Sequence, residues 1–382
     1  MREFDVLILG AGASGLMLSA LLKKQKRVAL IEGNSQIGAK LLVSGGRRCN
    51  ITNQNLNYKN YLGDGEFIKE ILGTFNQKRL IKWLKYQGVE LSLEKSSQLF
   101  CKNGSKAVIK LFEGLTKDIN LFLEHKITSL KFEKDRFILS TNRGKFRAKA
   151  VVVATGGVSF PKLGASDIGF EIAKSFGHTI KTLSPALVGF TLQKEQFFMK
   201  DLSGISTLAE IKVADKSFRD NLLFAHRGIS GPAILNSSLY WERGSIKVDF
   251  LPTFSLQNLN SKKQLSTILP LPKRASKAFL EHLKIKDKPY SNLNSAEFER
   301  LKLLKNYPLA PAGTFGFSKA EVTKGGVETD EVEPKSMMSR LQKNLFFTGE
   351  VLNVTGELGG YNLQWAFSSA YVCSRYLNSH LF

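Results

Sequence analysis

The 382-residue sequence contains few cysteines, no long apolar run, and few acidic residues for its number of basic ones. Its three cysteines, Cys49, Cys101 and Cys373, lie far apart and form no CxxC pair. This scarcity argues against a disulfide framework and a zinc site, and it favours a reducing compartment. No apolar stretch approaches the ~18 residues that a membrane-spanning helix needs. We therefore expect a cytoplasmic protein with no metal site and no membrane association.

An N-terminal signal peptide is also not expected. The apolar stretch from Val6 to Leu22 follows the segment MREFD, which is not basic overall, and glycines at motif spacing interrupt it.

The shortage of acidic residues gives the chain an unusual charge. Fifty-five Lys and Arg face 33 Asp and Glu, for a net charge of +22. Hydrophobic residues make up 43% of the chain, an ordinary globular share. So large an excess of positive charge attracts polyanions and steers their approach. The charge favours a nucleic-acid partner, with an acidic metabolite or no special partner as the alternatives.

The first thirty residues predict a strand over 4–9, a turn over 10–15, a helix over 14–26 and a second strand over 28–32. Both strands are apolar along their length, which is typical of a parallel sheet buried on both faces. The cations at the end of the helix suit its negative C-terminus.

A dinucleotide-binding motif occupies the turn. Gly10 allows the tight turn, Gly12 allows the backbone to approach a pyrophosphate, and Gly15 allows the helix to pack on the strand. The first helical residues, Ala13 and Ser14, offer free N–H groups and a positive dipole to the phosphates. Glu32 closes the second strand, where its carboxylate can accept hydrogen bonds from a ribose diol. The alternative is a chance glycine turn.

Later segments change in character along the chain. Residues 66–87 have helical apolar spacing, and short strands over 121–125, 127–133, 136–140, 145–147 and 150–154 indicate a β-meander. Residues 190–250 suggest further strands, and residues 255–306 are helical with eleven Lys or Arg against four Asp or Glu. After about residue 319 the glycine-rich motifs return. We expect an α/β fold in which a Rossmann-like domain (1–188 and 319–382) is interrupted by an inserted β-rich and helical substrate domain (189–318).

Two later motifs favour FAD over NAD as the bound nucleotide. A buried strand runs into the small residues Ala154, Thr155 and Gly156, where a nucleotide can pass close to the backbone. A second buried strand ends at Gly349 and Glu350, an acid suitably placed to bind the ribityl hydroxyls that NAD lacks. Each motif taken alone could be a packing turn.

The start of the last helix adds to this site. Gly359, Gly360, Tyr361 and Asn362 open it, so that its N-terminus can face the pyrimidine end of a flavin and stabilise negative charge there. The interior contains no second GxGxxG motif. NAD(P)H is thus expected as a transient hydride donor without a dedicated fold.

These residues together resemble a known family, the BaiN/RdsA-like NAD(P)/FAD-dependent oxidoreductases, also called the YhiN or aminoacetone-oxidase-like family. The resemblance covers nearly the whole chain. The motifs that carry it are Gly38–Asn50, Ala154–Gly157 with Pro161, His226–Pro232, Val322–Val327, Gly349–Leu352 and Gly359–Asn362. It implies an FAD domain split by an insertion. Two positions depart from the family pattern: Arg47 replaces a glycine of SGxGRCN, and Asn353 replaces an aspartate.

The resemblance implies further cofactor residues. Lys40 and Ser44 belong to its first segment, Gly45 and Gly46 would permit close approach to the flavin, and the Arg48 guanidinium would offer a charge-assisted hydrogen bond. Asn50 would add its amide, and the strand around Ile127 would offer backbone groups to adenine. An ordinary glycine loop is the alternative for residues 44–50.

Two residues are candidates for proton transfer. The Cys49 thiol could act as a general acid near the flavin, and a small buried cysteine is the equal alternative. His226 precedes a glycine-rich turn and could donate a proton to substrate, although a structural histidine explains it as well.

The family's named activities include reduction of uridine in ribosomal RNA to dihydrouridine, reduction of unsaturated steroid-like acids, and oxidation of a small amine. The charge favours the first, because a folded RNA presents many phosphates. Two basic stretches would grip them, residues 255–306 and a run of seven cations from Lys131 to Lys149. The target base would have to leave its stack to react. A small-molecule flavin enzyme and a non-catalytic flavin-bearing ribosome-assembly factor are the alternatives.

Overall fold

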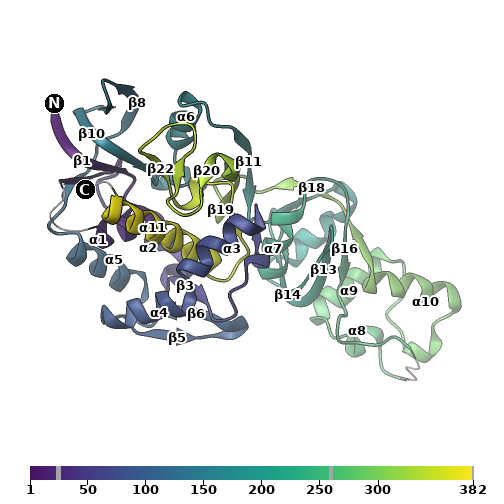
Figure 1. Cartoon of the computed structure of the whole chain (residues 1–382). Coiled ribbons are helices and arrows are strands. Elements are labelled where there is room, and N and C mark those ends of the chain that lie inside the picture. Colours follow the sequence, from purple (N-terminus) through teal and green to yellow (C-terminus); the bar gives the residue numbers. More distant parts are fainter. Residues whose placement is uncertain (23–26, 258–260, 381–382) are drawn as a thin grey trace. The chain divides into compact units, whose positions relative to one another are not determined.

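The computed structural model describes residues 1–22, 27–257 and 261–380 (Figure 1). The chain divides into two compact units, one formed by Met1–Ser184 with Val322–Phe382 and the other by Pro185–Glu321. Each unit has a hydrophobic core of its own. The divisions at 184 and 321 lie a few residues from those expected at 188 and 318.

The main sheet of the first unit has nine strands. Its path runs β20-β21-β22-β10-β1-β2-β7, and β8 joins it through β9, which pairs with β10. The strands are β1 (Arg2–Leu9), β2 (Val28–Ile31), β7 (Asn120–Phe122), β8 (Ile127–Glu133), β9 (Arg136–Thr141), β10 (Gly144–Val153), β20 (Val332–Glu333), β21 (Met338–Ser339) and β22 (Leu345–Phe347). The five strands from β22 to β7 are parallel, and the β8–β9–β10 meander is antiparallel. This is the Rossmann-like α/β fold that the sequence predicts.

The parallel strands end at a common edge. Leu9 pairs with Val153 on one side and with Ile31 on the other, and Phe347 also pairs with Val153. These strands are apolar and buried because helices cover both faces of a parallel sheet. The loops that follow β1, β2, β10 and β22 therefore meet at one edge, where ligands bind in open α/β sheets.

Helices and three small sheets complete the first unit (Figure 1). The helices are α1 (Ala13–Leu21), α2 (Ala39–Val43), α3 (Gly65–Thr74), α4 (Gln77–Tyr86), α5 (Gly104–Leu115), α6 (Ile168–Ser175) and α11 (Tyr361–His380). The small sheets are β3 (Asn50–Asn53) with β6 (Gln98–Cys101) and β5 (Leu91–Leu93), β4 (Tyr61–Leu62) with β23 (Thr355–Gly356), and β11 (Ile180–Ala186) with β19 (Val322–Val327).

Several element boundaries differ from those expected. The predicted helix over 66–87 is two helices, because Asn76 caps α4 by accepting a hydrogen bond from Arg79 N at 3.2 Å. The separate strands predicted at 145–147 and 150–154 form the single strand β10. α1 ends at Leu21, and residues 23–26 of the predicted first helix lie outside the described residues.

The second unit is built on a seven-stranded antiparallel sheet of order β17-β16-β13-β14-β15-β12-β18. Its strands are β12 (Phe190–Leu192), β13 (Ser206–Val213), β14 (Lys216–Ala225), β15 (Gly228–Ser230), β16 (Ile246–Asp249), β17 (Tyr307–Leu309) and β18 (Pro311–Thr314). Its helices are α7 (Pro232–Tyr240), α8 (Leu265–Ile268), α9 (Lys273–His282) and α10 (Ser295–Lys302). The last three lie within the basic stretch 255–306, as expected.

None of the helices in the described part of the chain combines the length and the apolarity that a bilayer crossing requires.

Candidate cofactor site

The turn after β1 has the geometry of a phosphate-binding loop. Gly10 has a φ of +101°, and a Cβ there would lie 2.7 Å from the Ala154 carbonyl oxygen. A Cβ on Gly15 would collide with the Gly10 carbonyl. A Cβ on Gly12, by contrast, would meet nothing within 4 Å. The backbone at Gly12 thus borders open space directly in front of the N-terminus of α1, where Ala13 is the first helical residue.

Glu32 is held at the end of β2 by backbone amides. Its Oε2 accepts a hydrogen bond from Ala11 N and its Oε1 one from Asn34 N, both at 2.8 Å. The half-buried carboxylate retains lone pairs that can accept from a ribose diol. His125 N donates to the Glu32 carbonyl at 2.9 Å, which brings the start of β8, with Ile127, beside the end of β2.

Glu350 is the centre of a cluster that joins three distant segments. Lys40 Nζ of α2 lies 3.0 Å from Glu350 Oε1 and 2.8 Å from Oε2. Thr323 N of β19 donates to Oε1 at 2.8 Å. A Cβ on Gly156 would lie 3.9 Å from Glu350 Oε2, and one on Gly157 would lie 3.0 Å from Oε1. Residues of α2, β19 and the loop after β10 therefore meet around one carboxylate.

Thr323 is a site residue that the sequence did not single out. It is 1% exposed, and its Oγ1 accepts hydrogen bonds from Val158 N at 2.9 Å and Ser159 N at 3.1 Å. Thr323 thus fixes the loop after β10 to Glu350. It stands in Val322–Val327, which carried part of the family resemblance. Its hydrogen bonds to Val158 and Ser159 span 165 and 164 residues, and the spacing of the residues around Thr323 does not indicate such contacts.

Gly349 brings the C-terminal segment onto the first helix. Its φ is +78°, and a Cβ there would lie 2.9 Å from the Ser14 Cβ. Gly349 N donates to Ser369 Oγ at 2.9 Å, and Trp365 Nε1 donates to the Gly349 carbonyl at 3.1 Å. α11 therefore holds Gly349 against the start of α1.

Several buried polar atoms in these segments have no hydrogen-bond partner. They include Ser14 Oγ in α1, Thr155 Oγ1 after β10, Thr348 Oγ1 before Gly349, and Asn50 Oδ1 in β3. An unsatisfied buried polar group costs about 1–3 kcal/mol. Four such atoms among the predicted cofactor segments fit a bound group that offers hydroxyl and phosphate partners. A dinucleotide provides both.

The start of α11 is packed tightly against β3. Gly360 has a φ of +94°, and a Cβ there would lie 2.6 Å from the Thr52 carbonyl. Asn362 closes the preceding turn, accepting from Gly356 N at 2.9 Å and donating to Gly356 O at 2.8 Å. Tyr361 is 7% exposed, and burial raises its pKa to about 12. Gly359 has a φ of +137°. The side chains here build the turn, so the N–H groups of α11 remain as the potential ligands.

The loop from residue 44 to 50 is largely in the left-handed region. φ is +54° at Gly45, +65° at Gly46, +70° at Arg47 and +57° at Cys49. The Ser44 hydroxyl donates to the Leu41 carbonyl at 2.7 Å. The two glycines therefore stand where the backbone requires them, whereas Arg47 and Cys49 adopt the same conformation with a side chain.

The polar side chains of this loop are engaged by the small β3–β6–β5 sheet. Arg48 Nη1 donates to both oxygens of Glu94, at 2.9 and 2.7 Å, and the guanidinium lies 4.3 Å from the centre of the Phe100 ring. Asn50 Nδ2 donates to Gln98 Oε1 at 2.7 Å. The partners of Arg48 within the protein are thus a carboxylate and an aromatic ring.

The structure also bears on the two candidates for proton transfer. Cys49 is fully buried, and desolvation raises the pKa of its thiol to about 12. Such a thiol is a poor general acid near neutral pH, so the geometry favours the small buried cysteine. His226 belongs to the second unit, where it is exposed in the turn between β14 and β15. The residues predicted to bind the cofactor all belong to the first unit.

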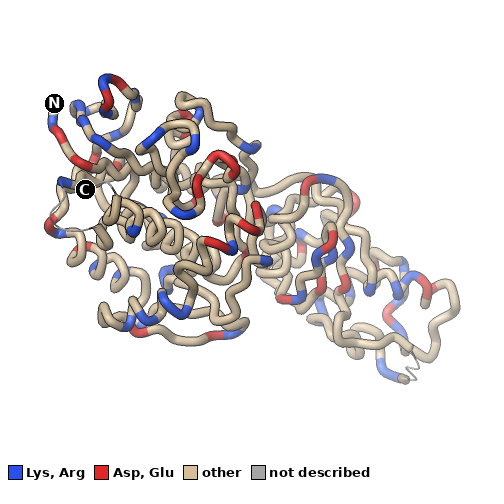
Figure 2. Tube along the Cα trace, in the orientation of Figure 1, with Lys and Arg blue, Asp and Glu red and all other residues tan. Residues whose placement is uncertain are grey.

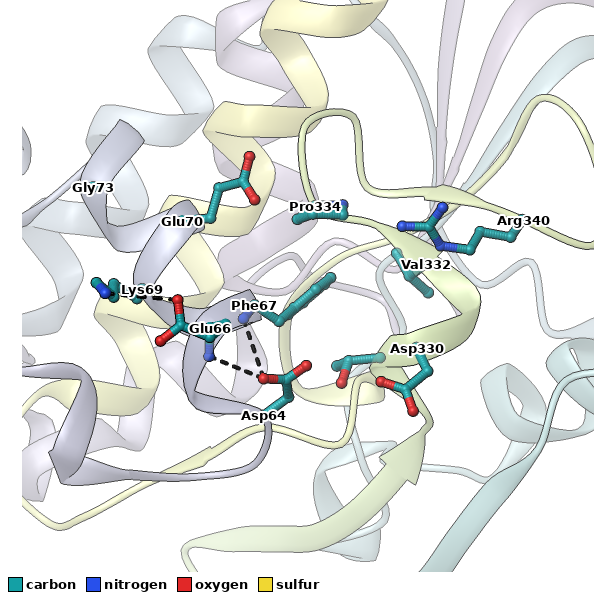
Figure 3. Close-up of a pocket in the computed structure, with 11 residues that line it drawn as sticks. Asp64, Glu66, Phe67, Lys69, Glu70, Gly73, Asp330, Val332, Pro334 and Arg340 are labelled. Carbon is teal, nitrogen blue, oxygen red and sulfur yellow. Dashed lines mark hydrogen bonds and ion pairs between the residues drawn. The ribbon is translucent and has the colours of Figure 1, made fainter.

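A cavity of about 750 Å³ occurs elsewhere in the first unit, between α3 and the segment 329–340 (Figure 3). Four carboxylates line it, those of Asp64, Glu66, Glu70 and Asp330, together with two cations. Asp64 also caps α3, accepting from Glu66 N at 2.9 Å. This acidic wall does not suit a diphosphate, and the predicted cofactor residues do not line the cavity. Among the described residues, no group of three or more His, Cys, Asp or Glu is placed to hold a metal ion.

Comparison with known proteins identifies the family. The model of the HI0933-like protein Rossmann domain matches residues 4–376. The chain belongs to the HI0933-like family. The ribosomal RNA dihydrouridine synthase of Haemophilus influenzae is 37% identical, and the alignment covers 96% of this chain and 97% of that protein. The 3-dehydro-bile acid delta(4,6)-reductase of Clostridium scindens is 29% identical, with 96% of this chain and 97% of that protein covered.

A solved structure shares the fold. The 3-ketosteroid-delta4-(5alpha)-dehydrogenase of Rhodococcus jostii superposes with a TM-score of 0.53 at 13% identity, covering 99% of this chain and 96% of that chain. The HI0933-like chain is therefore an oxidoreductase with the Rossmann-like fold of the flavoprotein oxidoreductases.

Proposed function

We propose that this HI0933-like chain binds FAD in its first unit. The cluster around Glu350 supports the proposal most directly, because it joins Lys40, Thr323 and Gly156 beside the loop that Gly12 opens. Gly12 and the N-terminus of α1 would hold the diphosphate, Glu32 the adenosine ribose, and Glu350 the ribityl hydroxyls. The N–H groups at the start of α11 would face the flavin ring. The unpartnered Ser14 and Thr155 hydroxyls would gain partners on binding.

We further propose that the substrate is uridine in ribosomal RNA, reduced to dihydrouridine. The relative of that name, 37% identical over nearly the full length of both chains, carries this proposal, and the net charge of +22 supports it. The chemistry that bound FAD supplies is two-electron transfer from NAD(P)H to a carbon–carbon double bond, with one proton completing the reduction. The chain's own task is to hold the extruded base and its flanking phosphates.

The flavin site is tested by a pair of variants at Gly12. Its φ is not in the left-handed region and a side chain there faces open space, so both Gly12→Asp and Gly12→Ala should fold. The aspartate places a negative charge where the diphosphate would lie. We expect Gly12→Asp to lose FAD and Gly12→Ala to retain most of it, as measured by flavin absorbance of the purified proteins. A wild-type protein that retains no FAD after reconstitution would refute the site.

The reaction is tested by nucleoside mass spectrometry. Ribosomal RNA from a strain that lacks the gene is incubated with the protein and NADH or NADPH, and dihydrouridine is quantified. We expect dihydrouridine to form with the wild type and to be absent with Gly12→Asp. Identical nucleoside composition with and without the enzyme would exclude this substrate. If the Gly12→Asp protein nevertheless corrected a growth or ribosome-assembly defect of that strain, a role in ribosome assembly without catalysis would be favoured.

A small-molecule carbon–carbon double-bond reductase is the second candidate. The bile-acid reductase of Clostridium scindens, 29% identical over nearly the same length, favours it. Oxidation of NAD(P)H that depends on an unsaturated steroid-like acid, without any product in RNA, would support this candidate over the first.

A further inference from the structure

Helix α4 (Gln77–Tyr86) carries an unusual charge. Four of its ten residues are cations, namely Lys78, Arg79, Lys82 and Lys85, and none is acidic. The preceding helix, α3, differs in this respect, since it contains two glutamates and one lysine (Figure 2). All four cations of α4 are exposed.

The cations and one aromatic side chain share a face of α4. Leu80 and Leu84 are buried, and Trp83 stacks on Phe112 with ring centres 6.2 Å apart. Lys78, Lys82 and Lys85 recur at i, i+4 and i+7, so they form a stripe on the opposite side. Tyr86 follows Lys82 by four residues and is 87% exposed. We call Lys78, Lys82, Lys85 and Tyr86 the α4 face.

The charge of the α4 face is not compensated by the protein. Like charges at i, i+3 and i, i+4 destabilise a helix. Within the described chain, no ion pair joins Lys78, Lys82 or Lys85 to an acid, and two acids that follow α4 in the sequence pair with other cations. Glu90 pairs with Lys102 at 2.9 Å, and Glu94 pairs with Arg48 at 2.7 Å. This run of like charges weakens α4 in the absence of a partner, and binding of a polyanion to α4 would explain it.

The two basic stretches that the sequence pointed to differ in this respect. In the run from Lys131 to Lys149, Arg143 pairs with Glu124 and Lys149 with Asp5, both at 3.0 Å. In residues 255–306, three cations are paired. These pairs are Lys288–Glu297 and Lys302–Glu299, each at 2.7 Å, and Lys305–Asp249 at 2.9 Å. Acids thus pair with three of the eleven cations in residues 255–306 and with part of the run from Lys131 to Lys149, whereas no ion pair in the described chain involves a lysine of the α4 face.

The α4 face is anchored to the element that carries the proposed flavin site. Just before α4, the Phe75 carbonyl accepts hydrogen bonds from Gln364 Nε2 at 3.2 Å and Ser368 Oγ at 2.6 Å. The Phe75 ring stacks on Tyr371 with centres 4.2 Å apart. Gln364, Ser368 and Tyr371 all belong to α11, whose first turn would face the flavin. RNA held on α4 would therefore be held by the same compact unit as the cofactor.

We propose that the α4 face binds a single-stranded segment of the substrate RNA. The three lysines neutralise successive phosphates, and an unstacked base lies on the Tyr86 ring. Stacking on an exposed aromatic side chain beside a basic stripe is how proteins hold single strands without reading their sequence. This inference rests on the proposed function, since it names the surface that holds that substrate.

The test compares FAD-loaded variants in binding to ribosomal RNA from a strain that lacks the gene, over a series of salt concentrations. One variant combines Lys78→Gln, Lys82→Gln and Lys85→Gln, and its matched control combines Lys273→Gln, Lys277→Gln and Lys284→Gln in the second unit. Each lost phosphate contact lowers the slope of log affinity against log salt by roughly 0.7–0.9. We expect the α4 variant to lose about 2 from the slope and the control to lose less. Gln has the helix propensity of Lys, so the melting temperature should not fall.

Tyr86 is tested separately. Tyr86→Ala should weaken binding by between about 5-fold and about 150-fold, the range for loss of one base stack, while Tyr86→Phe should bind as the wild type does. The inference is overturned if the α4 variant keeps the wild-type affinity and slope, if the control loses more, or if the wild type binds no ribosomal RNA. Failure of the proposed function is seen separately, as RNA binding that depends on the α4 face without any dihydrouridine formed.

Discussion

Lys40 and Glu350 provide a quantitative test of the proposed site. We predict that Lys40→Met and Glu350→Gln, made singly and together, will show a coupling free energy of about 1–3 kcal/mol in protein stability. Met keeps the apolar stem of Lys40 and removes only the charge. Gln keeps one oxygen for Thr323 N but turns an NH₂ group toward the Lys40 ammonium, so that two donors face each other.

The expected magnitude follows from the geometry and exposure of the pair. The ammonium lies 2.8 and 3.0 Å from the two carboxylate oxygens, and the side chains are 33% and 20% exposed. Exposed ion pairs contribute about 0.2–1 kcal/mol, and breaking a fully buried pair costs about 3–5 kcal/mol. A half-buried pair with two hydrogen bonds falls between these limits.

The assay is urea unfolding of the four proteins without FAD, followed by titration with FAD monitored by flavin fluorescence. A matched control is the same cycle on Arg48 and Glu94, using Arg48→Met and Glu94→Gln. That pair lies at a similar distance of 2.7 Å, but its side chains are 58% and 38% exposed. We expect the control coupling to stay below about 1 kcal/mol.

The titration tests the role of Glu350 toward the cofactor. Loss of one charge-assisted hydrogen bond to a ribityl hydroxyl should weaken FAD binding about 10-fold or more in Glu350→Gln. Unchanged FAD affinity would refute that role. A Lys40–Glu350 coupling no larger than that of Arg48–Glu94 would refute the account of the cluster.

Two further predictions concern the loop before β3. Arg47→Gly should raise the free energy of unfolding by about 0.5–1 kcal/mol in urea titrations. Relief of the left-handed φ of +70° is worth about 1–2 kcal/mol, which exceeds the cost of the entropy that glycine adds to the unfolded chain. A loss of stability would contradict this prediction. For Cys49, the folded pKa of about 12 exceeds the unfolded value of about 8.5, so its contribution is complete below pH ~8.5 and is lost as pH rises toward 12. Between these pH values, the free energy of unfolding should fall less steeply with pH in Cys49→Ala than in the wild type, by up to about 1.4 kcal/mol per pH unit. Identical slopes for the wild type and the variant would show that the thiol titrates in the folded state.

Local patterns predicted the first strand, the glycine turn and α1 because each depends on neighbouring residues alone. The break between α3 and α4 was not predicted. The apolar spacing of the segment continues past Phe75, and the side chain of Asn76, which caps α4, marks the start of the new helix. The single strand β10 was divided because Ala148 and Lys149 interrupt its apolar run, although they alternate between buried and exposed as a strand requires.

The sequence predicts residues for the candidate site but not the contacts among them. Lys40 and Glu350 were both expected to bind the cofactor, yet they are 310 residues apart and no sequence pattern pairs them. Arg48 was expected to bond the flavin, and its pairing with Glu94 depends on the register between β5 and β6. The α4 face was overlooked because a net charge does not reveal which cations are neutralised by folded neighbours.

The two departures from the family pattern have opposite structural consequences. Asn353 donates from Nδ2 to Glu328 Oε2 at 2.9 Å. An aspartate there would set two carboxylates against each other, so the asparagine suits its surroundings in this chain. Arg47 has no such compensation, because its side chain is exposed and its backbone keeps the left-handed conformation in which glycine is favoured. Since both lie outside the Glu350 cluster and the Gly12 loop, neither departure removes a group that the proposed flavin site requires.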